Sequence, residues 1–387
     1  MSGRASFFQR YLLPGFAFKA VVIGGGYATG RELAEFFMPL GPRGGLLAMA
    51  LAMLVWSAVC VATFLFARMT GSEDYRTFFR HLLGPGWVVY EAANLLFAVL
   101  ILAVFGAAAG AIGGALFGWP AVAGTLCLMF AIIAFVGYGT DSVERLFKWV
   151  SIFLYAVYAL FVILSLSRFG DRVLQNLALP AQAGGWVVNG LTYAGYNLVG
   201  AVIILPVLRH LQTRGDAVVA GLLAGPLAMI PAFLFFICMV AYYPQIGAEA
   251  LPSDFLLQRL NLPAFHLVFQ CMIFAALLES GAGCVHAINE RIAHAYAAKH
   301  AARLSHRARV GIAAVLLVGS MFLAERFGLV TLIARGYRLL AYVFLCVYIL
   351  PLMTYGVWRL YRGRNAAWPA PRPAVAGVTA APADSRA

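Results

Sequence analysis

The first long apolar segment of the chain, residues 12–39, is interrupted by Gly24-Gly25-Gly26-Tyr27-Ala28-Thr29-Gly30. Each glycine weakens a helix by about 1 kcal/mol relative to alanine, so three in succession predict unwound backbone. The residues from Thr29 to Glu32 would then begin a second half-helix, whose free N–H groups and positive dipole end favour an anionic group such as a carboxylate. The alternative is that the glycines only permit close helix packing.

The composition indicates a membrane protein. Of the 387 residues, 63% are hydrophobic and 11% are charged, against about 45–50% and 25% in a soluble domain. The apolar residues form runs of about 20 residues or more, which is the length that crosses a bilayer as a helix. We predict an all-α integral membrane protein with about ten spans, at residues 12–39, 45–68, 86–117, 119–138, 143–168, 186–211, 216–242, 263–297, 308–325 and 328–361.

The net charge of +13 is concentrated in alternate connections, which predicts the orientation of the chain in the membrane. The positively charged side includes Arg4, Arg10, Arg68, Arg76, Arg80, Arg145, Lys148, Arg209, Arg214 and Arg291. The opposite connections hold Arg43, Arg168, Arg172, Arg259 and Arg326. We therefore expect a multi-pass protein of the inner, cytoplasmic membrane with both termini in the cytoplasm. Residues 362–387 are rich in Pro and Ala and are predicted to form a disordered cytoplasmic tail.

The chain divides into two halves of five spans each. We predict a first repeat at residues 1–168, a connection at 169–185 and a second repeat at 186–361. The first span of the second half is also interrupted, at Thr192-Tyr193-Ala194-Gly195-Tyr196-Asn197. An odd number of spans per half gives the halves opposite orientations, and matching interruptions in inverted halves point to a transporter's binding site. The predicted substrate-binding residues are Gly24, Gly25, Gly26, Tyr27, Thr29, Gly30, Tyr193, Gly195, Tyr196 and Asn197. Generic packing is the alternative role for the two tyrosines of the second break.

Residues 24–32, read as Gly-Gly-Gly-Tyr-Ala-Thr-Gly-Arg-Glu, resemble the G-x-G-(F/Y)-(A/S)-(S/T)-G-(Q/R)-E segment of the YkvI-like amino-acid permeases. Residues 283–292 are similar to the eighth-helix segment of the same group. These permeases belong to the amino acid, polyamine and organocation superfamily. The resemblance, which covers residues 10–360 in outline, implies the leucine-transporter fold, a substrate site between the broken first and sixth helices, and often a sodium ion between the first and eighth.

Two neighbouring residues within the eighth span, Glu279 and Ser280, are candidates for ion or proton coupling. A carboxylate at membrane depth costs about 2.5–3.5 kcal/mol, so it needs a functional or structural explanation. Glu279 could bind a substrate amine, carry a proton, or pair with a buried arginine. The usual sodium ligands of this helix in the resembled group are hydroxyls. Because Ser280 alone supplies one here, protons are favoured slightly over Na⁺.

Two pairs of charged residues form a predicted outer gate. Glu32 and Glu35 follow the first break, Arg335 and Arg338 lie early in the tenth span, and each pair is spaced so as to share a helix face. In the resembled fold these regions face each other across the outer entrance. We expect a gate that closes over substrate, with static salt bridges as the alternative. An inner latch made of Lys19, Glu91 and Lys148 is a further hypothesis.

These features favour a secondary transporter with alternating access, driven by a proton or sodium gradient. The expected substrate is a small molecule, an amino acid or a related zwitterion. The alternatives are a ligand sensor on the same fold or, less favoured, a membrane-embedded enzyme, for which no nucleophile or paired-carboxylate motif is present. We predict no cofactor other than a coupling ion. The expected partners are the small-molecule substrate and the lipid bilayer, and nucleic acid is not expected. His286, Glu290 and His294 share a helix face, but they lie where the eighth span leaves the membrane, so no metal site is predicted.

Overall fold

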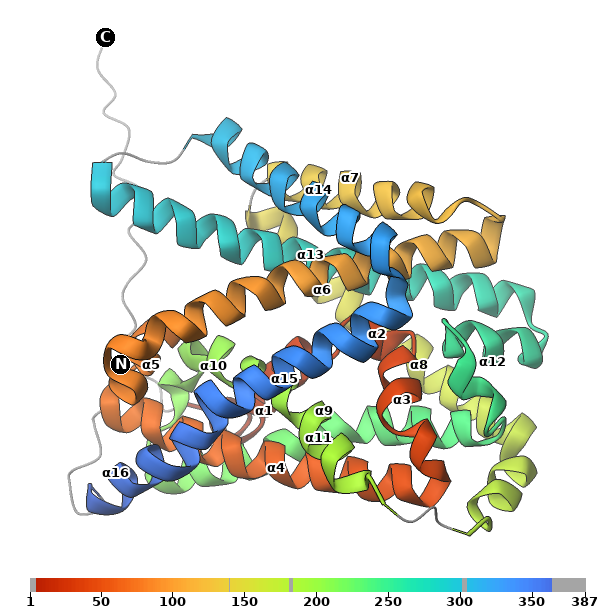
Figure 1. The fold of residues 1–387 in the computed structure, drawn as a ribbon, viewed down its shortest axis with the longest axis horizontal. Coiled ribbons are helices and arrows are strands. Elements are labelled where there is room, and N and C mark those ends of the chain that lie inside the picture. The colour runs from red at the N-terminus through yellow and green to blue at the C-terminus, as the bar shows by residue number, and fades with distance from the viewer. Residues whose placement is uncertain (1–4, 139, 181–183, 301–304, 364–387) are drawn as a thin grey trace.

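The structure is a computed structural model that describes residues 5–138, 140–180, 184–300 and 305–363, without the side chains of 136–152, 294–295 and 298–300. The described residues are almost entirely helical (Figure 1). The long helices are α4 (Gly41–Thr70), α6 (Trp87–Phe117), α7 (Ala121–Tyr138), α8 (Thr140–Leu177), α11 (Arg214–Val240), α13 (Pro263–His300) and α14 (His306–Thr331). The predicted tail lies outside the described residues apart from its first two positions.

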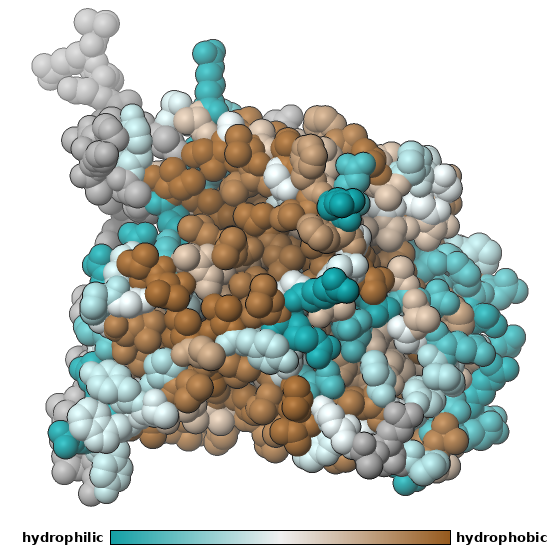
Figure 2. All heavy atoms as spheres, viewed as in Figure 1, coloured by the Kyte–Doolittle hydropathy of each residue, from teal (hydrophilic) through white to brown (hydrophobic). Residues whose placement is uncertain are grey.

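Among the described residues, six stretches of helix are long and apolar enough to cross a membrane. They are Arg31–Thr70, Tyr75–Phe117, Phe153–Leu177, Arg214–Val240, Pro263–Ala293 and His306–Arg362. Figure 2 shows a broad hydrophobic surface across the middle of the molecule and hydrophilic residues gathered toward one end. Large apolar side chains such as Val315 (74% exposed) and Phe322 (70% exposed) lie on the surface. The chain is therefore a multi-pass membrane protein whose lipid supplies the apolar surroundings of these side chains.

The first span is broken in two places. Helix α1 (Leu13–Val22) ends at Ile23, whose ψ of 84° is not helical, and Gly24 is extended. One turn follows, α2 (Gly25–Ala28), and then Gly30 adopts the left-handed φ of 79° before α3 (Arg31–Phe36). The expectation of unwound backbone over the whole of 24–30 is thus wrong, because Ala28 and Thr29 donate to the carbonyls of Gly24 and Gly25 at 2.9 and 3.1 Å.

The glycines of the first break also serve close packing. A Cβ on Gly25 would lie 2.2 Å from Leu277 of α13 and 2.8 Å from Phe105 of α6. Gly30 combines both roles, because its φ favours glycine and a Cβ there would approach Phe235 to 2.7 Å. The helix break and the close approach of neighbouring helices, which the sequence presents as alternatives, therefore occur together.

The sixth span is divided into α9 (Trp186–Asn197), α10 (Val199–Ile203) and the 3₁₀ segment η4 (Leu205–His210). The predicted interruption at Thr192–Asn197 is wrong, since these residues are the last turns of α9. The division falls just afterwards, at Leu198 and Ile204. Leu198 still donates to the carbonyl of Ala194 at 3.1 Å, which keeps α9 intact to Asn197. Pro206 lacks an N–H and lies in the first turn of η4.

The connections hold two short helices, α5 (Tyr75–Leu83) and α12 (Pro252–Leu260). They lie toward opposite ends of the molecule (Figure 1). The predicted connection 169–185 is mostly helix, since α8 continues to Leu177, before Pro180 and the two glycines that precede α9. The last two spans meet at Gly328, with φ 67° and ψ 166°. Beyond it the chain runs through η6 (Leu332–Tyr337), α15 (Arg338–Phe344), η7 (Leu345–Ile349), η8 (Leu352–Gly356) and α16 (Val357–Arg362).

The packing of the helices places the first break inside the bundle. Helix α1 packs against α11, and α4 packs against both α11 and α9. Helix α2 contacts α6 and α13, while α3 contacts α9 and η6. The broken first and sixth spans therefore lie side by side, enclosed by α4, α6, α13 and the α14–α16 region (Figure 1).

Candidate substrate site at the broken first helix

A buried carboxylate joins the broken first helix to the sixth span. Glu32 of α3 is only 3% exposed, and its Oε2 accepts a hydrogen bond of 2.6 Å from the Tyr196 hydroxyl of α9. Its other oxygen lies against Gly26 of α2, where a Cβ would come within 2.4 Å of Oε1. The glycine is therefore needed at position 26 because the Glu32 side chain fills the space beside it.

Aromatic side chains surround this carboxylate. Tyr27 of α2, Tyr193 and Tyr196 of α9 and Tyr337 of η6 are all buried, and Tyr196 donates its hydroxyl hydrogen to Glu32. The ring centroids of Tyr196 and Tyr337 are 4.7 Å apart, and those of Tyr193 and Tyr196 are 5.6 Å apart. The carboxylate is therefore bound by a tyrosine that packs against two further tyrosines, one from α9 and one from η6.

The Tyr193 hydroxyl has no hydrogen-bond partner in the described part of the protein, although the residue is 0% exposed. Tyr27, in contrast, donates to the carbonyl of Ala228 at 3.3 Å. A buried hydroxyl without a partner costs about 1–3 kcal/mol. Such an atom next to a buried carboxylate marks a place where a polar ligand or water would find a partner.

The remaining predicted site residues mostly serve the backbone of the two breaks. Thr29 donates from Oγ1 to the carbonyl of Gly26 at 3.1 Å, and Asn197 donates to the carbonyl of Tyr193 at 3.0 Å. Gly195 lets α9 approach α15, since a Cβ there would lie 3.1 Å from the carbonyl of Ala341. Gly24 packs next to the Phe105 ring. The structure thus brings Gly26, Tyr27, Tyr193 and Tyr196 to the carboxylate and uses Thr29, Asn197, Gly195 and Gly24 to shape the helices around it.

The four residues of the predicted outer gate do not all meet. Glu35 contacts Arg338 with 3.8 Å between Oε1 and Nη2, and it also pairs with Arg31 at 2.8 Å. Glu32 turns inward to Tyr196 instead, and Arg335 is exposed. The pair that could open and close the outer side is therefore Glu35 with Arg338, and Glu32 belongs to the interior.

Charge reversal tests the Glu35–Arg338 contact. Glu35→Arg is expected to slow transport, and the double change Glu35→Arg with Arg338→Glu to restore part of the loss. Both side chains are partly exposed, so the coupling energy should be modest, about 0.5–1 kcal/mol. A double-mutant cycle on uptake rate measures it. Arg335→Glu is the matched control, because exposed Arg335 should not compensate; strictly additive effects for Arg338 would contradict the gate.

Arg31 makes contacts at the first break that the sequence does not predict. It is 4% exposed, and its Nη1 donates to the carbonyls of Gly247 and Glu249 at 3.0 and 2.7 Å. A second hydrogen bond joins the same two regions: the N–H of Ser253, at the start of α12, donates to the Thr29 carbonyl at 3.0 Å. The connection that contains α12 is therefore fastened directly onto the break in the first helix.

Glu279 is half-buried on α13, near Tyr155 of α8. Lys19 of α1 is 7% exposed, with its Nζ 4.0 Å from the Tyr155 ring centroid. Ser280 follows Glu279 and is also half-buried. Helices α1, α8 and α13 thus bring the Lys19 ammonium, the Tyr155 phenol and the Glu279 carboxylate to one region next to the first break.

The inner latch is not assembled as predicted. Glu91 lies 3.5 Å from Arg291 and 3.8 Å from Arg76, whereas Lys19 lies over the Tyr155 ring. The side chain of Lys148 lies outside the described residues. The structure instead joins Arg10 to Asp216 at the start of α11, through two hydrogen bonds of 2.9 and 2.7 Å. In the part of the chain that is described, no cluster of His, Cys, Asp and Glu could hold a metal ion.

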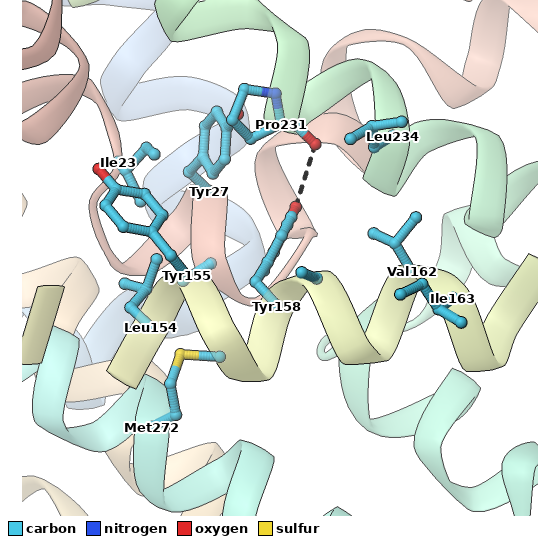
Figure 3. Close-up of a pocket in the computed structure, with 12 residues that line it drawn as sticks. Ile23, Tyr27, Leu154, Tyr155, Tyr158, Val162, Ile163, Pro231, Leu234 and Met272 are labelled. Carbon is cyan, nitrogen blue, oxygen red and sulfur yellow. Dashed lines mark hydrogen bonds between the residues drawn. The ribbon is translucent and has the colours of Figure 1, made fainter. Parts of the chain in front are cut away.

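A cavity of about 290 Å³ lies beside the first break (Figure 3). Apolar and aromatic side chains of the break and of α8, α11 and α13 line it, and the Tyr158 hydroxyl donates to the Pro231 carbonyl at 3.2 Å. Ile163, on its rim, is 64% exposed. The cavity therefore opens sideways toward the hydrophobic surface and is separate from the carboxylate at Glu32.

Comparison with known proteins supports the fold. No protein-family model matches the chain, and no curated protein sequence is significantly similar to it. Many solved structures do align, including the following three. MhsT in complex with L-phenylalanine has a TM-score of 0.58 and 18% identity, covering 92% of this chain and 98% of its own. A Na⁺-coupled sialic acid symporter has a TM-score of 0.59 and 13% identity, covering 92% and 82%. A manganese transporter mutant of Eremococcus coleocola has a TM-score of 0.56 and 17% identity, covering 91% and 81%.

These alignments span nearly the whole chain, and all three neighbours are membrane transporters of the leucine-transporter fold. The protein is therefore an all-α membrane protein with this fold, as the sequence predicts. At such low identity, the likeness extends to the fold and not to the substrate.

Proposed function

We propose that the protein is a secondary active transporter, coupled to an ion gradient, that moves a small solute bearing an ammonium group, an amino acid or a related zwitterion. The observation that carries the proposal is the buried carboxylate of Glu32 between the broken first and sixth spans, hydrogen-bonded to Tyr196 at 2.6 Å. Broken helices with polar groups in the interior of a transporter fold are where such proteins bind substrate.

Alternating access requires contacts that can break on each side of this carboxylate in turn. Toward one side, Arg31 binds the carbonyls of Gly247 and Glu249, and Glu35 contacts Arg338. Toward the other, Arg10 pairs with Asp216. We propose that the first set closes the outer side and the second the inner side, with both termini in the cytoplasm and the protein in the cytoplasmic membrane.

The coupling ion is proposed to be H⁺ or Na⁺. Glu279 and Ser280 on α13, close to Tyr155 and α1, remain candidates for binding it. The nearby Lys19 ammonium, buried over the Tyr155 ring, puts a positive charge in the region where a sodium ion would have to bind. This charge favours protons, because like charges at short range repel.

Uptake into liposomes tests the proposed function. The purified full-length protein is reconstituted, and uptake of labelled amino acids is measured under a proton gradient and, separately, under a sodium gradient. We expect accumulation under one of the two gradients and none in protein-free vesicles. Binding without flux under either gradient would instead indicate a ligand sensor on the same fold.

A further inference from the structure

The Glu32 carboxylate has no counter-charge among the residues that the structure describes. Tyr196 is its hydrogen-bond donor, and no lysine, arginine or histidine of the described residues forms an ion pair with it. Arg31 follows the break next to it in sequence but directs its guanidinium to the carbonyls of Gly247 and Glu249 and to Glu35. Glu32 is therefore a buried acid whose neighbour in sequence, Arg31, directs both terminal nitrogens to other partners.

The elements α2, α9 and η6 pack against α3, and the charged side chain that they carry, Arg335 of η6, is exposed. Helix α2 contributes Tyr27, α9 contributes Tyr193 and Tyr196, and η6 contributes Tyr337. The segment η5 (Gln245–Ala248) and Glu249 after it meet Arg31 through carbonyl groups. On α15, Arg338 contacts Glu35 and lies over the Phe36 ring, 5.5 Å from its centroid. No fixed cation therefore balances the carboxylate.

A carboxylate buried without a counter-charge costs several kcal/mol in its charged form. It must either bind a proton or meet a cation. The surroundings suit a cation, because electron-rich ring faces attract positive charge and the Tyr193 hydroxyl has no partner. One carboxylate in a closed site accommodates only one of the two at a time.

We propose that Glu32 is a shared site for a proton and for the ammonium group of the substrate, so that binding of one displaces the other. The step is balanced: the protonated carboxyl loses its O–H proton to water, and the resulting carboxylate pairs with the R–NH₃⁺ group. The carboxylate and the ammonium group together carry no net charge, as the protonated carboxyl did before binding. This inference rests on the proposed transport function and specifies it, since a site of this kind exchanges protons for an ammonium compound.

The first test measures proton release on binding. Purified full-length protein in weakly buffered detergent with a pH indicator is mixed with L-phenylalanine, L-leucine or phenethylamine, which all carry an ammonium group on an apolar frame. The matched control ligand is 3-phenylpropionate, which keeps the ring and the carboxylate but lacks the ammonium. At least one ammonium compound is expected to raise the unfolding temperature and release protons, whereas 3-phenylpropionate does neither.

Substitution of the carboxylate assigns the effect to Glu32. Glu32→Gln is expected to weaken binding of the same compound by about 10- to 100-fold, the usual effect of losing a charged hydrogen bond, and to abolish proton release. Glu325→Gln, a change at an exposed carboxylate, is the matched control and should retain both. Proton release that survives Glu32→Gln but is lost in Glu279→Gln would overturn the inference, and so would a lack of response to all three ammonium compounds.

Tyr196→Phe provides a second test of the inference if the Glu32→Gln variant does not fold. It removes the donor to the carboxylate and keeps the charge. If a proton and the ammonium compound compete for Glu32, the apparent affinity for the compound falls about tenfold for each pH unit below the midpoint at which Glu32 binds its proton. Because the lost hydrogen bond favoured the charged form, the midpoint of this profile should move to higher pH. An unchanged midpoint contradicts the inference, since a structural role alone would not involve the proton.

The two proposals can fail separately. Ion-driven uptake without Glu32-dependent proton release would leave the transporter in place and refute the shared site. Glu32-dependent proton release without flux under any gradient would support the shared site and refute transport.

Discussion

Replacement of Gly26 by alanine is expected to weaken substrate binding at least tenfold while the protein still folds. The added Cβ would lie 2.4 Å from Oε1 of Glu32, 2.9 Å from its Cγ and 3.0 Å from its Cδ. These atoms belong to a flexible side chain, so Glu32 can move away and the backbone can remain in place. The movement breaks the Tyr196 hydrogen bond, whose loss leaves a buried polar group unpaired at a cost of about 1–3 kcal/mol.

Thermal unfolding and ligand titration of the same sample distinguish loss of binding from loss of folding. Gly319→Ala is a suitable control, because a Cβ at this helical glycine meets nothing within 4 Å. A second variant, Gly26→Ala with Glu32→Asp, shortens the acidic side chain by one methylene and should recover part of the binding. Unchanged affinity in Gly26→Ala would count heavily against a site at Glu32.

Removal of Arg10 is expected to destabilise the protein and to open its inner side. Asp216 is almost fully buried, and Arg10 donates to both of its oxygens at 2.9 and 2.7 Å. The aspartate keeps other donors, among them the N–H of Gln212 at 2.8 Å and the hydroxyl of Thr213 at 2.8 Å. Arg10→Ala should therefore lower the free energy of unfolding by about 1–3 kcal/mol, which is less than the penalty for a buried charge left without any partner.

Two measurements test the Arg10 prediction. The unfolding temperature in detergent should fall, and a cysteine introduced at Lys19 should react faster with a water-soluble thiol reagent in the Arg10→Ala background. Arg10→Lys is the conservative control, since it keeps one charged donor and should recover part of the stability. Equal labelling rates with and without Arg10 would show that the pair does not close the inner side.

The sequence was sufficient to predict the fold, for physical reasons that act locally. Long apolar runs, Pro and Gly at the joins and glycines within the first span each determine structure over a few residues, and the spans at 86–117 and 263–297 agree with α6 and α13 to within three residues. Helix-breaking glycines did not have the same effect everywhere. Residues 25–28 form a helical turn because neighbouring helices pack closely around it, which no local propensity reveals.

The site was predicted less completely, because its contacts join distant parts of the chain. Glu32 was grouped with Glu35 from their spacing, but its partner Tyr196 lies 164 positions further on and draws it inward. Likewise, the sequence places Arg31 at the start of a half-helix but does not reveal its partners, since its acceptors are backbone carbonyls in a connection of ordinary composition. The spacing of residues along the sequence predicts which of them share a helix face, but it does not predict which distant residues contact that face.

The fastening of the first break onto the α12 connection has a consequence for biosynthesis. Arg31 finds its carbonyl partners 216 and 218 residues later in the chain, and the Thr29 carbonyl finds its donor at Ser253. While the ribosome is making the first half, the Arg31 guanidinium has Glu35 but not its carbonyl partners, the Thr29 carbonyl lacks its donor Ser253, and lipid supplies no replacement for either. The first span should therefore insert poorly alone and reach its final depth only after α11 and α12 have emerged. A nascent chain arrested before residue 247 should accordingly expose residues 29–31 to water-soluble reagents, and one released after α12 should protect them.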